Sequence, residues 1–387
     1  MDNDNFFVEQ RKKENLREVV IPNKNEIYLD LLNIEHSLTG MLDNVADTFT
    51  LECVQMLINS LELFEMGYFD CAFFSLRSVI DLATTMVFLS DIQDYEERNA
   101  RIIEWNNLSE FHQRLQMIKK LKNEGNVFIE MLGKMPSFFD EAEKTSKILN
   151  KYVHKQGLKN FYISRNNIFN FDKYNIQQFT EEFITIFKRV VKIFAVMRLA
   201  IDPLPVLLMD EDIKYRCYDS LTDPYSQKFI DQYIGSETLD DYKKTEMYIE
   251  AYAYFISQEK KNDAIYDIIK YKYIDTRKIK EIKSQFYMLS NDDKIATAIA
   301  LSCIKINRIY CYKGLLRYDT ERHSNREVKT RNRKDFERFK NAEFKYNQEY
   351  ENVLISVFLL NNNLFFVEHN DPLDDEDIST IKNIQKF

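Results

Sequence analysis

The sequence predicts an all-α protein, in which a helical bundle is followed by a second helical region. Apolar residues recur at three- and four-residue spacing over long windows, as on the buried face of a helix. Only seven glycines and six prolines interrupt the 387 residues, whereas hairpin-rich folds need many such turn residues. With 45% hydrophobic residues, the chain can bury a sizeable core.

In the first half of the chain, a helix is expected wherever this spacing persists between polar breaks. Pro203 and Pro205 stop the last of them, because proline lacks the amide hydrogen. We therefore expect an N-terminal segment with the first helix (residues 1–44), a bundle (45–205) and a C-terminal helical domain (206–387). The expected helices are Lys24–Gly40, Thr48–Met66, Phe69–Ser90, Tyr95–Trp105, Ser109–Asn123, Ser137–His154 and Ile176–Asp202.

The second half is also expected to be helical. Ser290 should cap one of its helices, because a short side-chain oxygen can accept a hydrogen bond from an orphan backbone amide. Residues 160–171 and 364–367 could be short extended pieces, but neither would build a sheet alone. The expected helices are Asp223–Ile234, Leu239–Gln258, Lys261–Tyr271, Asp275–Leu289, Asp292–Leu316 and Phe336–Leu360.

Charge and cysteine usage indicate the compartment. The net charge of -9 argues against coating of the whole surface by nucleic acid, although a local basic patch could bind phosphates. The five cysteines are scattered without a CxxC pair, which suits a reducing compartment. The N-terminus has no apolar signal core, and Arg77 and Asp81 interrupt the longest apolar stretch. We expect a cytoplasmic bacterial protein that does not enter a membrane.

Motif absences argue against several enzyme classes. A backbone that cradles phosphate needs glycines at set spacings, and neither GxxxxGK[ST] nor GxGxxG occurs. HExxH, GxSxG and paired-cysteine zinc patterns are also absent, and the five histidines lie far apart in the sequence. We therefore expect neither a cofactor nor a metal.

Residues 148–157 are the segment where chemistry is most plausible. Asn150 and His154 are spaced i, i+4, so their side chains share one helical face and can touch. A histidine can act as general acid or base near neutral pH, while the amide of Asn150 orients it or the substrate. The alternative is structural: His154 ends its helix and interacts favourably with the helix dipole, with Gly157 in the left-handed cap region.

Arg77 and Asp81 form a second i, i+4 pair, in an otherwise apolar helix. If both face the core they must pair, because an unpaired buried charge is very costly. The pair could simply fix the register of the helix, or it could line a site beside His154.

The order of these elements resembles HEPN-type helical proteins, many of which serve bacterial conflict and antiphage systems. The resemblance spans about residues 45–200 and rests on the segments LRSVIDL (76–82) and NKYVH (150–154). The motif of that family is an arginine, a polar residue, three others and a histidine. Its nucleases cut RNA without a metal, usually by pairing two motifs across a dimer.

The resemblance places Asn150 at the polar position, His154 at the histidine position and Leu149 where the arginine would stand. This departure matters, because an arginine would stabilise the developing phosphate charge and a leucine cannot. Arg77 from the neighbouring helix, or Arg165 from the following loop, could supply the missing cation.

Residues 322–340 form a basic run in an otherwise acidic protein. Such a segment could contact the phosphates of RNA, or it could be a solvated connection between helices. Its most concentrated basic residues are Arg326, Lys329, Arg331, Arg333 and Lys334.

Two functions are therefore considered. The first is a bacterial defence- or toxin-type HEPN-like protein that cleaves RNA as a metal-independent endoribonuclease, using Asn150 and His154. The second is a non-catalytic helical interaction or regulatory protein, whose core lost catalysis when Leu149 took the arginine position. RNA and either a second copy of the chain or another protein are the expected partners. Three tyrosines on one helix could anchor such an interface or form a core stripe: Tyr248, Tyr252 and Tyr254.

Overall fold

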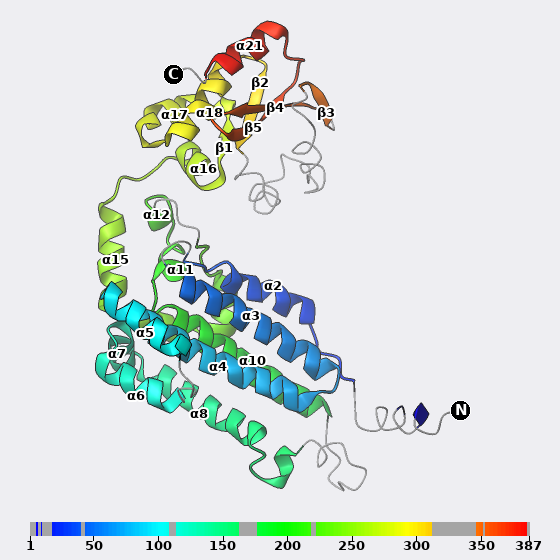
Figure 1. Ribbon diagram of the computed structural model, residues 1–387, viewed down its shortest axis with the longest axis vertical. Coiled ribbons are helices and arrows are strands. Elements are labelled where there is room, and N and C mark those ends of the chain that lie inside the picture. The colour runs from blue at the N-terminus through cyan, green and yellow to red at the C-terminus, as the bar shows by residue number, and fades with distance from the viewer. Residues whose placement is uncertain are drawn as a thin grey trace. The chain divides into compact units, whose positions relative to one another are not determined.

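The computed structural model describes residues 5, 6, 9, 18–39, 43–107, 114–161, 176–217, 222–311, 346–350 and 353–384. The protein is predominantly α-helical, as the sequence predicts, with a small antiparallel sheet near its C-terminus (Figure 1). The chain divides into two compact units. The first comprises Met1–Lys214 and Ser220–Ser257, and the second comprises Tyr215–Asp219 and Gln258–Phe387.

The first unit is a helical bundle. Figure 1 shows α4 and α10 in its middle, with α2 and α3 on one side and α6 and α8 on the other. Its longer helices are α2 (Lys24–Glu35), α3 (Asn44–Glu65), α4 (Phe69–Ser90), α5 (Tyr95–Asn107), α6 (Arg114–Glu124), α7 (Val127–Lys134), α8 (Pro136–Val153), α10 (Ile176–Arg198) and α15 (Glu246–Ser257). The shorter helical segments are η1 (Leu158–Asn160), α11 (Leu204–Leu207), α12 (Glu211–Lys214), α13 (Gln227–Phe229), η2 (Ile230–Ile234) and α14 (Ser236–Tyr242).

Helix α4 is the central element of this bundle. Its length and apolar composition would suffice to cross a membrane, but 72% of its most apolar window is buried inside the protein. Large rings fill the space around it: Phe64 stacks on Phe183 with ring centroids 3.8 Å apart, and Phe73 of α4 stacks on Tyr152 of α8 at 3.9 Å. Helix α4 is therefore a core helix, consistent with a soluble protein.

The two units divide after Ser257, not after Pro205 as the sequence indicated. Pro205 lies within α11, and the chain beyond it continues to pack on the same core. The hydroxyl of Tyr225 donates to the carbonyl of Ala195 at 3.1 Å, and that of Tyr242 donates to the carbonyl of Leu199 at 2.9 Å. The prolines end a helix but not a domain. The first helix, α2, also packs on α3 within this core and is not a separate segment.

The second unit combines a sheet with helices. The strands are β1 (Tyr273–Asp275), β2 (Ile306–Cys311), β3 (Gln348–Tyr350), β4 (Val353–Leu360) and β5 (Asn363–His369), in the order β1-β2-β5-β4-β3. One face packs with the helices through residues such as Phe358 and Phe365, and the other carries Val357 and Phe366, as the two-residue period of a strand requires. The helices are α16 (Asp263–Tyr271), α17 (Ile279–Ser284), α18 (Asn291–Ser302) and α21 (Asp375–Asn383), with the turns η3 (Thr276–Lys278) and η4 (Phe286–Met288).

Two expected helices in this unit are wrong. The one expected over Asp292–Leu316 ends at Ser302 and is followed by β2, and the described end of Phe336–Leu360 is the strands β3 and β4. Asn361 and Asn362 are both left-handed, with φ of 48° and 62°, and they join β4 to β5 where Leu360 pairs with Asn363. Two left-handed residues make a type I′ turn, which matches the twist of a hairpin.

Other local expectations agree with the structure in whole or in part. The helix expected over Asp275–Leu289 is present as three shorter segments, η3, α17 and η4, and the extended piece at 364–367 lies inside β5. Ser290 caps α18 as predicted, since its Oγ accepts a hydrogen bond from the backbone N–H of Asp293 at 3.2 Å. Most of the other extended piece, residues 160–171, lies outside the described residues.

Candidate functional site

The end of α8 is fixed against two neighbouring helices. The ring of Tyr152 stacks on Phe73 of α4, and its hydroxyl donates to Glu182 Oε1 of α10 at 2.6 Å. The ring anchors α8 through dispersion and the hydroxyl through a charge-assisted hydrogen bond. These contacts set the rotation of α8 and therefore the direction in which Asn150 points.

Arg77 meets Asn150 across this helix pair. The Nε of Arg77 donates to Asn150 Oδ1 at 2.7 Å, and Nη1 of the same guanidinium forms an ion pair with Asp81 one turn along α4. The arginine side chain is only 16% exposed. Leu149, at the position where the HEPN pattern has arginine, is fully buried in the core. The cation beside Asn150 therefore comes from α4.

A second arginine enters the same polar cluster from α6. The Nε of Arg114 donates to Thr84 Oγ1 at 3.3 Å, its Nη1 donates to Ser146 Oγ at 3.1 Å, and Nη1 lies 3.6 Å from Glu143 Oε2. Burial lowers the pKa of Arg114, and the nearby positive charge of Arg77 lowers it further. A guanidinium still stays protonated at any physiological pH, so two fixed positive charges lie close together here.

His154 caps the C-terminal end of α8. Its backbone N–H donates to the carbonyl of Asn150 at 2.9 Å, and its side chain is exposed. One helical turn, about 5.4 Å along the axis, separates the two residues. The left-handed residue that closes the helix is Lys155, with φ of 54°, and Gly157 is left-handed further on, with φ of 89°. His154 thus ends the helix and presents an accessible imidazole.

The sequence singled out some members of this site and missed others. Arg77, Asp81 and Asn150 are in contact, with His154 one turn away. Arg114, Glu143 and Ser146 were missed. Glu143 lies seven positions before Asn150 and Ser146 lies four positions before it, so all three share one face of α8. A search for polar residues at helical spacing on α8 would therefore have found them. Arg114 has no comparable signal, because only packing brings α6 to this place.

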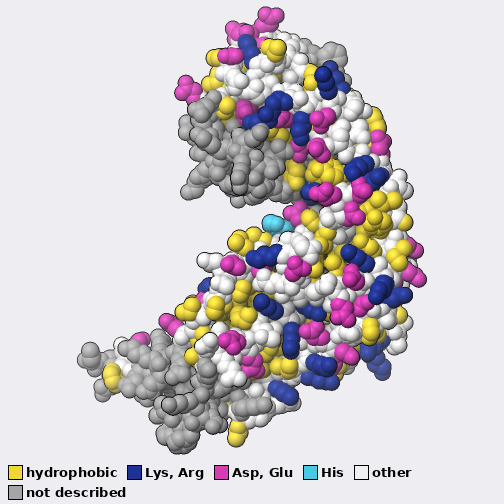
Figure 2. Space-filling model, turned by 180° about the vertical axis from the view of Figure 1, so that it is seen from behind, with side chains coloured by type: hydrophobic (Ala, Val, Ile, Leu, Met, Phe, Trp, Pro, Cys, Tyr) yellow, Lys and Arg dark blue, Asp and Glu magenta, His cyan; other side chains and the backbone are white. Residues whose placement is uncertain are grey.

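The remaining predicted site residues lie outside the described residues. This holds for Arg165 and for the basic group Arg326, Lys329, Arg331, Arg333 and Lys334. On the face seen in Figure 2, lysine and arginine side chains are intermixed with carboxylates. The described surface on this face therefore presents no broad field of positive charge.

The chemistry available at the site is phosphate binding and proton transfer. Two guanidinium groups can stabilise a phosphate, the amide of Asn150 can donate or accept a hydrogen bond, and the imidazole of His154 can carry a proton. In the part of the chain that the structure describes, no three His, Cys, Asp or Glu side chains gather as metal ligands would.

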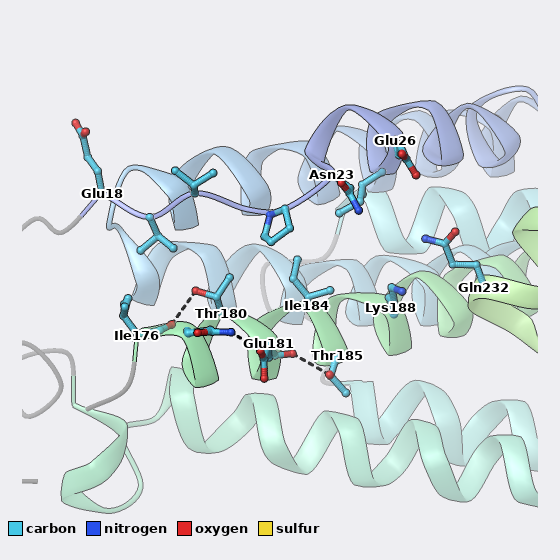
Figure 3. Close-up of a pocket in the computed structure, with 15 residues that line it drawn as sticks. Glu18, Asn23, Glu26, Ile176, Thr180, Glu181, Ile184, Thr185, Lys188 and Gln232 are labelled. Atoms are coloured by element: carbon cyan, nitrogen blue, oxygen red, sulfur yellow. Dashed lines mark hydrogen bonds between the residues drawn. The ribbon is translucent and has the colours of Figure 1, made fainter. Parts of the chain in front are cut away.

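A cavity of about 660 Å³ lies elsewhere in the first unit, between residues 18–27 and α10 (Figure 3). Ile176, Thr180, Ile184 and Lys188 of α10 form one wall, and none of the predicted site residues lines it. Glu18 points away from it in Figure 3. Its lining mixes aliphatic and polar residues, and the hydroxyls of Thr180 and Thr185 donate to backbone carbonyls rather than to a base, so it is not the candidate for catalysis.

No family model, no curated protein and no solved structure matches this chain.

Proposed function

We propose that this chain is a HEPN-like protein of a bacterial defence or toxin-type system, acting in the cytoplasm as a metal-independent endoribonuclease. The observation that carries the proposal is the 2.7 Å hydrogen bond from Arg77 Nε to Asn150 Oδ1, one turn before the exposed His154. In this proposal Arg77 of α4 takes the place of the arginine that the motif of residues 149–154 lacks.

The reaction that suits these groups begins at the 2′-hydroxyl of RNA. His154 takes the proton of that hydroxyl, the oxygen attacks the adjacent phosphorus, and the bond to the 5′-oxygen of the next nucleotide breaks. The departing 5′-oxygen takes up a proton from water, which leaves a 2′,3′-cyclic phosphate and a 5′-hydroxyl, and His154 then releases its proton to the solvent. The guanidinium of Arg77 stabilises the negative charge that develops on the phosphate oxygens.

The pairing of Arg77 is compatible with this role. Nε bonds Asn150 and Nη1 bonds Asp81, whereas Nη2 makes no hydrogen bond or ion pair with another described residue. Asp81 holds the guanidinium in one orientation, which lowers the cost of ordering it when a phosphate binds. Arg165 and the basic segment around Arg331 are proposed as further phosphate contacts.

The test is cleavage in the presence of a chelator. Purified protein should cut an unstructured RNA but not the same sequence with 2′-deoxyribose, and His154→Ala should lose at least about 100-fold in rate. His36→Ala is the matched control, because His36 is also an exposed histidine next to a helix end. Cutting of the deoxy strand, or equal rates for His154→Ala and wild type, would refute the mechanism.

One observation favours the second candidate, a non-catalytic interaction or regulatory protein that forms a homodimer or binds a protein partner. Helix α15 has no buried residue although it is apolar in composition, and Ile249 and Tyr254 are 54% and 61% exposed. Of its tyrosines, Tyr248 packs against the edge of the core, whereas Tyr254 is exposed. An exposed apolar helix indicates an interface. Sedimentation velocity of wild type and Ile249→Glu tests this: a monomeric wild type that captures no partner excludes it.

A further inference from the structure

Helix α8 carries a row of lysines beside the candidate site. Lys144, Lys147 and Lys151 follow the i, i+3, i+7 spacing that keeps side chains on one face of a helix. All three are exposed, and together they span about 10 Å of the helix axis. This lysine row comes from a single helix and is independent of the basic segment at 322–340.

Little within the described structure neutralises the lysine row. Lys147 Nζ lies 3.6 Å from Glu143 Oε1, but the lysine side chain is 69% exposed, so the attraction is largely screened. Lys144 and Lys151 form no ion pair with another described residue. The ammonium groups of Lys144 and Lys151, together with the weakly paired one of Lys147, can therefore meet an anionic ligand.

The row borders the residues proposed for cleavage. Asn150 lies three positions after Lys147, which makes the two residues neighbours on the surface of α8. His154 ends that helix three positions after Lys151. An anion bound along the lysines would therefore lie next to the residues proposed for cleavage.

A large exposed ring lies on the other side of the site. Phe74 of α4 is 59% exposed, and it sits between two points where α4 meets the end of α8. Four positions before it, Asp70 pairs with Lys155, and three positions after it, Arg77 bonds Asn150. An exposed phenylalanine beside a cation offers a stacking surface for an unpaired base.

We propose that the lysine row binds the backbone phosphates of a single RNA strand while Phe74 stacks on one of its bases. This rests on the proposed function, since it names the form of RNA that the Asn150–His154 site receives. A duplex fits less well, because its bases are already stacked on each other and cannot reach the ring.

The test measures binding without cleavage. A short fluorescent 2′-O-methyl oligouridylate lacks the attacking hydroxyl, so its affinity does not depend on catalysis. For single strands, each phosphate that a lysine neutralises adds about 0.7 to the slope of log affinity against log salt, so Lys147→Gln/Lys151→Gln should flatten that slope by about 1.4. Lys280→Gln/Lys283→Gln removes the same charge from two exposed lysines of α17 in the second unit and should leave the slope unchanged.

The base contact is tested separately. Phe74→Ala should weaken binding of the single strand about tenfold, Phe74→Trp should retain it, and the pre-annealed duplex should respond to neither. Equal slopes for the two lysine variants, or unchanged affinity of Phe74→Ala, would overturn the inference. Those results are distinct from failure of the proposed function, which is decided by cleavage with His154→Ala.

Discussion

The hydrogen bond between Arg77 and Asn150 predicts a measurable coupling energy. A hydrogen bond with one charged partner contributes about 1.5–3 kcal/mol. Arg77 is 16% exposed and Asn150 is half-buried, so some solvent screening remains. We therefore expect the lower end, about 1.5 kcal/mol, as the interaction term of a double-mutant cycle with Arg77→Met and Asn150→Ala.

The assay is urea unfolding followed by fluorescence. The chain has one tryptophan, Trp105, which lies in the first unit with its ring centroid 5.8 Å from that of Phe49. Its emission therefore reports the unit that holds the site. Ser78→Ala is the control, because the Ser78 hydroxyl donates to the carbonyl of Phe74 in its own helix and bonds no other described residue. A coupling below about 0.3 kcal/mol would mean that the two residues act independently and would refute the reasoning.

Three further predictions concern buried ionisable groups. Burial lowers the pKa of Lys261 to about 8, below the unfolded value, so the stability of wild type relative to Lys261→Met should rise by about 3 kcal/mol between pH 7 and pH 11. Burial also lowers the pKa of His369, so the stability that its neutral ring contributes should be lost as the pH falls below about 6.5, relative to His369→Gln. Fully buried Arg198 bonds the Ser37 carbonyl at 2.6 Å and pairs with Asp202, so Arg198→Met should cost about 3–5 kcal/mol of unfolding free energy.

Chemical denaturation across pH, followed by circular dichroism, measures the first two as differences between variant and wild type. A difference in unfolding free energy between variant and wild type that stays constant across pH would contradict either prediction. Tryptophan fluorescence measures the third, and a loss under about 1 kcal/mol would show that Arg198 is not held as a buried ion pair.

Much of the helical unit follows from periodicity. The bounds of α4 come directly from its apolar pattern, and the i, i+4 spacing of Asn150 and His154 places them one turn apart at the end of α8. The contact of Arg77 with Asn150 joins residues 73 positions apart. Helical spacing cannot predict such a contact, because it depends on how Phe73 and Tyr152 bring the two helices together.

The second unit shows where local pattern is ambiguous. Residues 353–360 are an apolar run with isoleucine and valine, which suits a buried helix or a strand equally well. The two asparagines that follow, Asn361 and Asn362, favour a strand that turns into a hairpin. Asparagine tolerates the left-handed backbone that a type I′ turn needs. Pro203 and Pro205 predicted a domain boundary that is absent, because they end a helix while the chain beyond them packs on the same core.

The proposal that Arg77 replaces the arginine of the motif is tested most directly by the rate of RNA cleavage by Arg77→Met, measured with a chelator present. We predict a loss of about 100-fold or more, with 2′,3′-cyclic phosphate ends on the product of the wild-type protein. Wild-type rates for Arg77→Met, or products that end in a 3′-hydroxyl, would contradict it.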